Sequence, residues 1–217
     1  MSENIHFIEK KVTTKNLAPG KTVYGERLFQ YEGAEYREWD PYRSKFAAAI
    51  RKGLKQIPIR PRMNVLYLGA ASGTTASHVS DLVGQEGVVY CVEFSPRAMR
   101  DLLRICESRS NMIPILADAR FPETYRMFIG PVDVIYQDVA QPAQAKILVD
   151  NAKIFLKHEG HAMLAIKARS IDSSKEIAAI FSEEIDILKS DFIVEETIES
   201  LKPFDKDHCM VIGQFTA

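Results

Sequence analysis

Three acidic side chains, Glu93, Asp118 and Asp138, follow successive apolar runs that have the length and composition of buried strands. If these strands lie parallel in one sheet, their carboxyl ends meet at one edge and the three carboxylates line one crevice. A single acid at a strand end is usually a cap or a surface group, but three around one crevice favour a binding site. Carboxylates repel a pyrophosphate and suit a ligand with hydroxyl groups, an amino group and a positive charge.

The loop after the first of these strands reads Gly69-Ala70-Ala71-Ser72-Gly73-Thr74 and opens a helix. A dinucleotide site of the G-x-G-x-x-G type needs glycine where Ala71 stands, and a P-loop ends in G-K-[ST]. The loop matches neither, so it is either a plain strand–helix turn or part of a site for another nucleoside. S-adenosylmethionine, a nucleoside with a sulfonium charge, fits the acids. We expect Glu93 to accept hydrogen bonds from its ribose hydroxyls, by analogy with dinucleotide folds.

The remaining elements are those expected to hold this edge in place. From Asn64 onward, strand and helix patterns alternate, and two strands without an intervening helix close the chain. This order predicts an α/β fold with a mostly parallel, Rossmann-like sheet, covered on both faces, and an antiparallel strand near the end. The expected strands are 65–68, 88–94, 113–116, 132–136, 162–168, 192–198 and 209–215, and the expected helices are 74–83, 96–108, 143–156 and 173–188.

The segment before the sheet has a different pattern. Residues 5–37 contain short alternating runs separated by Pro19-Gly20, Gly25 and Gly33, which predicts β-hairpins. A helix is then expected to open at Asp40-Pro41, with Asp40 as its N-cap, and to extend to the prolines at 58 and 61. We therefore divide the chain into a small N-terminal β region, 1–38, and a Rossmann-like domain, 39–217.

Composition limits the possible functions. The net charge of −1 argues against strong autonomous binding to nucleic acid, although the first 62 residues carry an excess of lysine and arginine. We find no RNA-recognition motif and no interleaved basic and aromatic residues along the sequence. No apolar stretch is long enough for a membrane helix, and the first residues lack a signal-peptide pattern, so we expect a cytoplasmic protein without membrane contact. The three cysteines are scattered without a CxxC pair, and we expect no metal site.

Several segments together resemble one known family. GAASGTTASHVSDLVG, VEFSPR, ILADAR, VDVIYQDVAQPAQA and IKARSID occur in this order and spacing, with RSKFAAAI before the sheet and DHCMV near its end. They resemble fibrillarin, the RNA 2′-O-methyltransferase of box C/D ribonucleoproteins, over nearly the whole chain. The resemblance implies a class I S-adenosylmethionine-dependent methyltransferase fold. The sequence has no Gly/Arg-rich tail and so looks like the compact archaeal form.

The resemblance also implies functional residues and partners. The catalytic set of the family, Lys-Asp-Lys-His, matches Lys45, Asp138, Lys167 and His208. The implied partners are a box C/D guide RNA, the target rRNA or tRNA, a Nop-domain scaffold protein and a kink-turn-binding subunit. The implied cofactor contacts are Gly69, Ala70, Gly73, Thr74, Thr75, Glu93, Phe94, Asp118, Ala119, Asp138, Val139, Ala140 and Gln141.

Methylation of a ribose hydroxyl requires positioning of the hydroxyl and removal of its proton. Lys167 and Asp138 follow neighbouring predicted strands, so we expect Lys167 to be the proton acceptor or an electrostatic stabiliser, with Asp138 orienting it. Lys45 provides a positive neighbour that would favour the first role, and Asp138 favours the second. Taken singly, Lys45 and Lys167 are more typical of surface lysines and His208 of a loop histidine. We expect His78 to be structural.

Three other functions stay open at this point. A class I methyltransferase acting on a small molecule or a protein would have the same cofactor acids but a deep apolar pocket. A non-catalytic particle subunit would not need to bind S-adenosylmethionine. An NAD-type reductase is disfavoured by the glycine pattern of the loop.

Overall fold

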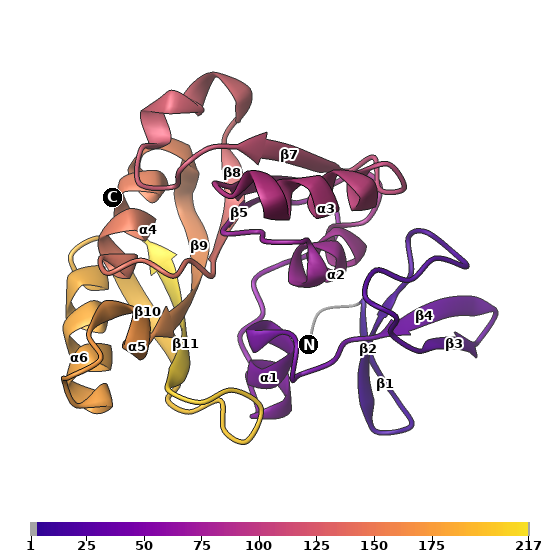
Figure 1. The fold of residues 1–217 in the computed structure, drawn as a ribbon, viewed down its shortest axis with the longest axis horizontal. Coiled ribbons are helices and arrows are strands. Elements are labelled where there is room, and N and C mark those ends of the chain that lie inside the picture. Colours follow the sequence, from indigo (N-terminus) through magenta and orange to yellow (C-terminus); the bar gives the residue numbers. More distant parts are fainter. Residues whose placement is uncertain (1–3, 217) are drawn as a thin grey trace.

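The computed structural model describes residues 4–216 and contains two β-sheets. The smaller sheet is antiparallel with strand order β1-β2-β4-β3, and it lies apart from the larger sheet, at the end of the molecule drawn in indigo and violet (Figure 1). Tight turns join its strands in pairs, with Glu32 and Gly33 at positive φ between the last two, so the predicted hairpins are confirmed. Its strands are β1 Ile5–Ile8, β2 Lys11–Lys15, β3 Leu28–Tyr31 and β4 Ala34–Glu38.

The larger sheet has seven strands in the order β10-β11-β9-β8-β5-β6-β7. The five strands from β9 to β7 are parallel neighbours, and β11 inserts antiparallel between β9 and β10. The predicted α/β class, with a mostly parallel sheet and an antiparallel strand near the end, is confirmed. The strands are β5 Asn64–Leu68, β6 Val88–Glu93, β7 Met112–Leu116, β8 Val132–Gln137, β9 Leu156–Lys167, β10 Phe192–Ile198 and β11 His208–Phe215.

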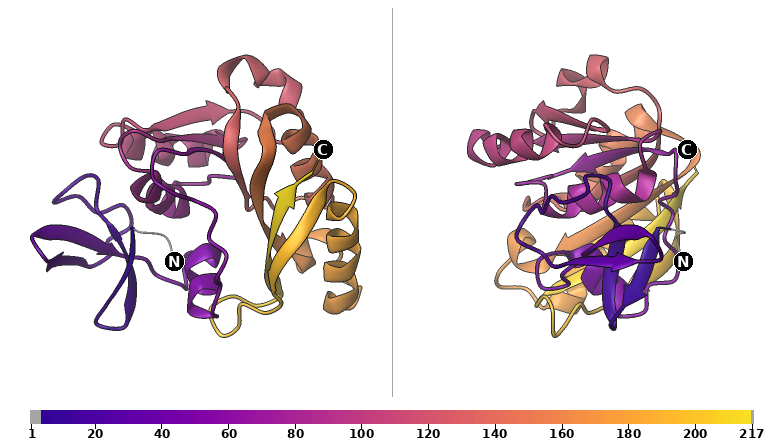
Figure 2. Two further views of the ribbon diagram at one scale, coloured as in Figure 1. Left: turned by 180° about the vertical axis from the view of Figure 1, so that it is seen from behind. Right: turned by 90° about the vertical axis from the view of Figure 1, so that its right-hand side faces the viewer.

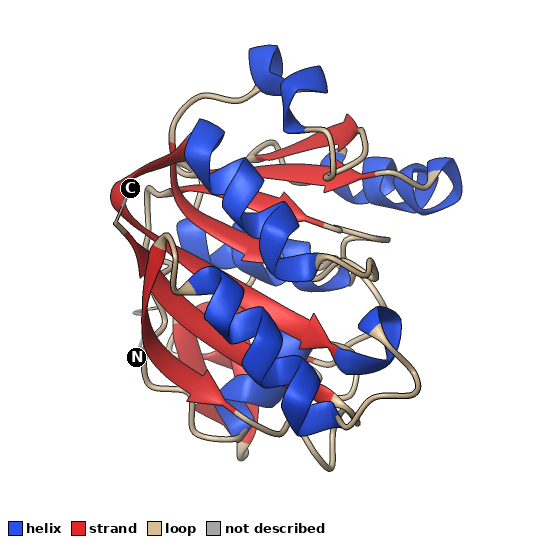
Figure 3. Ribbon diagram, turned by 90° about the vertical axis from the view of Figure 1, so that its left-hand side faces the viewer, coloured by secondary structure: helices blue, strands red, loops and turns tan. Residues whose placement is uncertain are grey.

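Helices cover both faces of this sheet, as the side views show (Figures 2 and 3). Alternate residues of a strand point to opposite faces, so Val65 and Tyr67 of β5 pack with α1, α2 and α3, whereas Leu66 and Leu68 pack with α4 and α6. The helices are α1 Lys45–Arg51, α2 Thr74–Val83, α3 Pro96–Cys106, α4 Gln144–Phe155, α5 Ala168–Ile171 and α6 Ile177–Leu188, with 3₁₀ turns η1 Pro122–Thr124 and η2 Arg126–Phe128.

The predicted start of the first helix at Asp40-Pro41 is wrong. The side chain of Asp40 accepts a hydrogen bond from the amide of Tyr42, at 2.9 Å, and closes a turn instead. The hydroxyl of Ser44 caps the helix by accepting from the amide of Ala47. The helix ends at Arg51, before Gly53 at positive φ, and does not extend to the prolines. This later start places Lys45 in the first helical turn.

Other boundaries differ by smaller amounts, with two exceptions. β9 begins at Leu156, directly after α4, and not at Ala162, because Gly160 fits closely against Leu156 and lets the strand continue. The predicted helix 173–188 is interrupted: α5 ends at Ile171, the carboxylate of Asp172 accepts from the amide of Ser174, and α6 begins at Ile177. Asx turns of this kind compete with helical hydrogen bonds.

Buried charges join the small sheet to α2 and α3. Asp81 of α2 forms ion pairs with Arg37 of β4 and with Arg109, and all three side chains are almost fully excluded from solvent. Arg37 also pairs with Glu26 at 3.0 Å, and Arg109 donates to the side-chain oxygen of Asn16. Because buried charges are costly unless they are paired, this network fixes how the small sheet sits on α2.

His78 lies inside the same region and is fully buried. The hydroxyl of Thr14 donates to Asp81, so it accepts from Nδ1 of His78 at 2.7 Å, and Nε2 then accepts from the hydroxyl of Tyr24 at 2.9 Å. Burial lowers the pKa of His78 well below its usual value, and nearby Arg37 acts in the same direction. The histidine is therefore a neutral structural group, as the sequence predicts.

Cys91 and Cys209 are buried and Cys106 is half-buried. Within residues 4–216, no helix is long and apolar enough to cross a lipid bilayer.

Candidate functional site

The four residues proposed as catalytic converge at the carboxyl edge of the large sheet. The Oδ1 atom of Asp138 lies 2.8 Å from Nζ of Lys167 and 3.3 Å from Nζ of Lys45. His208 begins β11 and is paired in register with Lys167, the last residue of β9. The structure thus brings together residues from a helix and three strand ends. Their catalytic roles stay a prediction.

Asp205 is a fifth member of this cluster that the sequence analysis does not single out. Its Oδ2 atom lies 3.6 Å from Nζ of Lys45, and its Oδ1 atom lies 2.9 Å from Nδ1 of His208. Asp205 therefore links two of the four residues. Its position three residues before His208 was visible in the sequence, but no periodic pattern indicates where a loop side chain points.

The environment of His208 favours its neutral form. Partial burial lowers its pKa, and although Asp205 acts in the opposite direction, the charge of Lys45 lowers it further. A neutral His208 leaves two cations and two carboxylates in the cluster, because Lys45 and Lys167 are balanced by Asp138 and Asp205. The cluster therefore carries no excess positive charge that would repel a cationic ligand.

Local hydrogen bonds hold the two lysines in place. Lys167 donates its amide to the buried side chain of Gln144 at 2.9 Å, and its Nζ donates to the backbone oxygen of Asp138 at 2.9 Å. Lys45 follows the cap residue Ser44, whose hydroxyl oxygen also accepts from the hydroxyl of Thr75, at 3.0 Å. The helix that carries Lys45 is thus bonded directly to the start of α2.

A cavity of about 260 Å³ adjoins this cluster at the ends of β5, β6, β7 and β8. Asp138 and Lys167 line both the cavity and the cluster, so a ligand in the cavity reaches the two residues expected to act on the acceptor. The other lining residues are Gly69, Ala71, Val92, Glu93, Phe94, Ala117, Asp118, Ala119, Val139, Ala140 and Gln141.

Glu93 is held rigidly at the cavity wall. Its Oε2 accepts from the amide of Ala71 at 2.8 Å and its Oε1 from the amide of Ser95 at 2.8 Å, and the residue is only 6% exposed. A carboxylate has about four acceptor positions, so two stay available for hydroxyl groups of a ligand. Phe94, beside it, is largely exposed at the rim.

A match to a protein-family model accompanies this geometry. The model described as Fibrillarin matches residues 2–217. The chain belongs to the fibrillarin family.

Related proteins and structures agree with this assignment. A fibrillarin-like rRNA/tRNA 2′-O-methyltransferase of Thermococcus onnurineus is 57% identical over 203 residues, which is 94% of this chain and 89% of the relative. The structure of Aeropyrum pernix fibrillarin with natively bound S-adenosyl-L-methionine is 50% identical, with a TM-score of 0.88 over 96% of this chain and 92% of that one. A fibrillarin/Nop5p complex is 40% identical, with a TM-score of 0.92 over 99% of both chains.

Two glycines shape the fibrillarin-family loop by their conformation. Gly69 has φ +81, and a Cβ on it would lie 2.9 Å from the backbone oxygen of Asp138. Gly73 has φ +91, and a Cβ there would lie within 3 Å of side chains of Leu102 and Ile105. A side chain at either position would push the loop away from β8 or from α3.

Several predicted cofactor contacts lie outside the cavity wall. Ala70, Gly73, Thr74 and Thr75 do not line it, and the hydroxyl of Thr75 is engaged with Ser44. Their contact with a cofactor stays a prediction. Conversely, Ala71, Val92 and Ala117 line the cavity without having been predicted, because nothing in a small apolar residue signals a site.

Asp118 lies at the cavity, but Arg120 occupies much of its carboxylate. The guanidinium of Arg120 forms hydrogen bonds to both carboxylate oxygens and holds the pKa of Asp118 below its usual value. The side chain of Arg120 is half exposed, so it is displaceable by a ligand amino group. No cluster of three or more histidine, cysteine or acidic residues able to hold a metal occurs in the part of the chain that the structure describes.

Proposed function

We propose that this chain, an S-adenosylmethionine-dependent RNA 2′-O-methyltransferase, modifies ribose 2′-hydroxyls of rRNA, and also of tRNA, at positions selected by a box C/D guide RNA. The observation that carries the proposal is the shared wall between the cavity and the polar cluster. Asp138 and Lys167 belong to both, so the two reactants would meet at these side chains.

The cavity fits the cofactor by its donor and acceptor chemistry. Glu93 offers two free acceptor positions to ribose hydroxyls, Phe94 offers an aromatic face at the rim, and Asp138 offers negative charge next to the cluster. S-adenosylmethionine, when bound, supplies a methyl group on a positive sulfur, ready for in-line displacement. The chain would therefore hold the ribose at Glu93 and the charged end towards Asp138.

The polar cluster would act on the hydroxyl that accepts the methyl group. A 2′-hydroxyl is a poor nucleophile, so it must be held in line and lose its proton as the new O–C bond forms and the C–S bond breaks. Nζ of Lys167 is fixed by the carboxylate and the carbonyl of Asp138. These two acceptors favour the ammonium form, so we assign Lys167 to stabilising the developing oxyanion, and proton acceptance by its neutral amine is the alternative. Lys45 would add positive charge beside it.

The partners are proposed from the family. A Nop-domain scaffold is supported by the fibrillarin/Nop5p complex, to which this chain is similar over 99% of its length. A guide RNA and a kink-turn-binding subunit would complete the particle and provide most of the RNA affinity, which agrees with the net charge of −1. We place this particle in the cytoplasm.

The direct test is transfer of labelled methyl groups in a particle assembled from this chain, a box C/D guide RNA and the two partner proteins. The target RNA carries a complementary sequence, and a matched control target has a 2′-deoxy nucleotide at the guided position. We expect label on the first target and none on the second, because the control lacks the acceptor oxygen.

Absence of label on both targets, in particles that are assembled and bind S-adenosylmethionine, would contradict guided ribose methylation. The activity would then be sought on small molecules or proteins. If the chain does not bind S-adenosylmethionine at all, the non-catalytic subunit is the better interpretation.

A further inference from the structure

An exposed aromatic pair lies beside the polar cluster. Tyr42, in the segment before α1, is 68% exposed, and its ring meets that of Phe204 edge-on with 5.2 Å between centroids. Phe204, in the loop before β11, is half-buried. Large exposed rings are typical of binding surfaces, because they bury much apolar area at a low cost in side-chain entropy.

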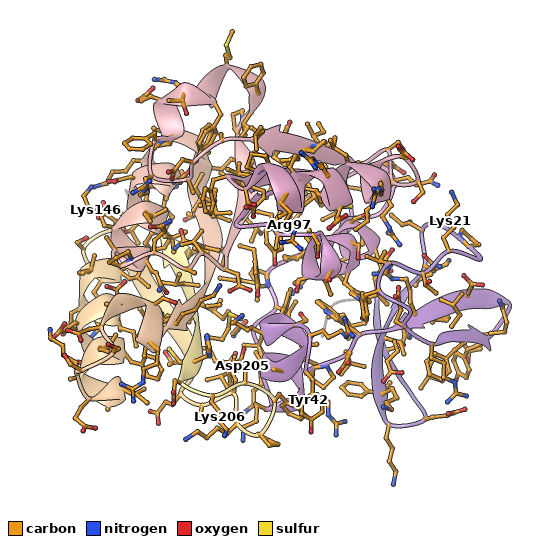
Figure 4. The ribbon with its side chains drawn as sticks, viewed as in Figure 1. Lys21, Tyr42, Arg97, Lys146, Asp205 and Lys206 are labelled. Atoms are coloured by element: carbon orange, nitrogen blue, oxygen red, sulfur yellow. The ribbon has the colours of Figure 1, made fainter. Side chains whose placement is uncertain are left out.

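Both rings are next to the proposed site, on two separate chain segments. Tyr42 precedes Lys45 by three residues, and Phe204 directly precedes Asp205, which pairs with both Lys45 and His208. Figure 4 shows Tyr42, Asp205 and Lys206 gathered at the same end of the molecule, near α1. A substrate that reaches Lys45 therefore passes over Tyr42 and Phe204.

Hydrogen bonds hold the pair in a fixed position. The amide of Tyr42 donates to Asp40, and the amide of Phe204 donates to the backbone oxygen of Leu201 at 3.0 Å. Leu201 is itself fully buried and donates its amide to the backbone oxygen of His208. A surface held in this way is preformed, so binding to it requires little ordering.

Cations without ionic partners surround the pair. Lys202 and Lys206 are exposed in the same loop as Phe204, and neither forms an ion pair within residues 4–216. A hollow of about 310 Å³ adjoins the two rings and is also lined by Lys10 and Arg51, which likewise form no ion pair with any described residue. Unpaired lysine and arginine next to aromatic rings are suited to a polyanion with flat apolar surfaces, such as RNA.

We infer that Tyr42 and Phe204 pack against the ribose of the target nucleotide next to the one that is methylated, while Lys202 and Lys206 contact its phosphates. This inference rests on the proposed function. In an A-form guide–target duplex, the 2′-hydroxyls lie in the wide, shallow minor groove. When one hydroxyl reaches Lys167, the neighbouring riboses must lie over the surface that surrounds the cluster.

A kinetic test compares Tyr42→Ala, Tyr42→Phe and the control Tyr31→Ala in the assembled particle. Tyr31 is also an exposed tyrosine (45%) with an edge contact, to Tyr36, but it lies in the small sheet. We expect Tyr42→Ala to raise KM for the target RNA about 5- to 30-fold, the equivalent of about 1–2 kcal/mol of apolar burial. KM for S-adenosylmethionine should not change, and Tyr42→Phe and Tyr31→Ala should resemble the wild type.

Hydroxyl-radical footprinting of the target strand reads the same contact without methyl transfer. In the wild-type particle we expect protection of a ribose next to the guided nucleotide, lost in Tyr42→Ala and retained in Tyr31→Ala. An unchanged KM and footprint in Tyr42→Ala would overturn the inference. So would loss of scaffold binding by Tyr42→Ala, because it would assign the ring to a protein interface.

The two proposals fail in different ways. A wild-type particle that methylates the guided ribose while Tyr42→Ala behaves identically leaves the function intact and removes the inference. A wild-type particle that protects the neighbouring ribose through Tyr42 but transfers no methyl group supports the inference and contradicts the function.

Discussion

At the scale of single residues, Asp138 connects the two parts of the proposed site. Its carboxylate pairs with Lys45 and Lys167, and its backbone oxygen accepts from Nζ of Lys167 and lies against Gly69. One residue thus sets the positions of both lysines relative to the cofactor loop. Without its charge the two ammonium groups would repel each other across the site.

Replacement of Lys167 tests the chemistry of the cluster. We expect Lys167→Ala to lower kcat by about 10²- to 10⁴-fold, the usual contribution of a group that assists proton transfer, while S-adenosylmethionine still binds. The matched control is Lys146→Ala, an exposed lysine of α4 far from the cluster (Figure 4). Turnover is measured by methyl transfer and binding by calorimetry. Full turnover in Lys167→Ala, with normal cofactor binding, would remove Lys167 from the mechanism.

At the scale of elements, Ser44 joins two of them. Its hydroxyl caps α1, which presents Lys45, and accepts from Thr75 in the first turn of α2. The Oγ of Ser77 in α2 in turn donates to the backbone oxygen of Thr74 and accepts from Arg37. The start of α2 is therefore fixed from the small sheet on one side and from α1 on the other.

Removal of the Ser44 hydroxyl should affect both stability and catalysis. Ser44→Ala should reduce the free energy of unfolding by about 1 kcal/mol, as is typical for a lost N-cap, and should lower kcat because Lys45 loses its fixed position. Ser95→Ala is the matched control, since Ser95 caps α3 in the same way without a bond to Thr75. Denaturant unfolding and single-turnover methylation measure the two effects. Equal effects of both variants on kcat would show that Ser44 acts only as a cap.

At the scale of the whole molecule, the buried charges around Asp81 attach the small sheet to the large one. Asp81→Ala would leave Arg37 and Arg109 buried without their shared partner. We expect a loss of about 3–5 kcal/mol in the free energy of unfolding. The control, Asp101→Ala, breaks an exposed pair with Arg104 and should cost less than about 1 kcal/mol. Similar losses in the two variants would argue against a structural role for the network.

The buried histidine predicts how stability depends on pH. The pKa of His78 is lowered in the folded state, so the unfolded chain binds a proton that the folded chain does not. Stability from this group is complete above the unfolded pKa, about 6.5, and falls below it by up to about 1.4 kcal/mol per pH unit. His208 acts in the same direction.

Denaturant unfolding between about pH 7.5 and pH 5.5 measures this dependence, a range in which histidine is the main titrating side chain. His78→Gln should be less stable at neutral pH but should lose less stability on acidification. A slope equal to that of the wild type would assign the pH dependence to other groups.

The sequence by itself determined the fold class, the order of the elements and the family. Strand and helix periods are local, and the alternation from Asn64 onward admits few topologies, so Glu93, Asp118 and Asp138 could be placed at one sheet edge in advance. The motifs GAASGTT, VIYQDVAQP and IKARSID name the candidates Asp138 and Lys167 because they are continuous in sequence.

Only the tertiary structure decided how distant segments meet. Whether Asp40 or Ser44 caps α1 depends on which hydrogen bond the Asp40 side chain makes, and the competing turn is invisible in a pattern of residue types. Asp205 reaches Lys45, and Tyr42 meets Phe204, because the loop before β11 returns to the start of α1. Such contacts follow from chain packing, since side chains far apart in the sequence carry no local signal of each other's position.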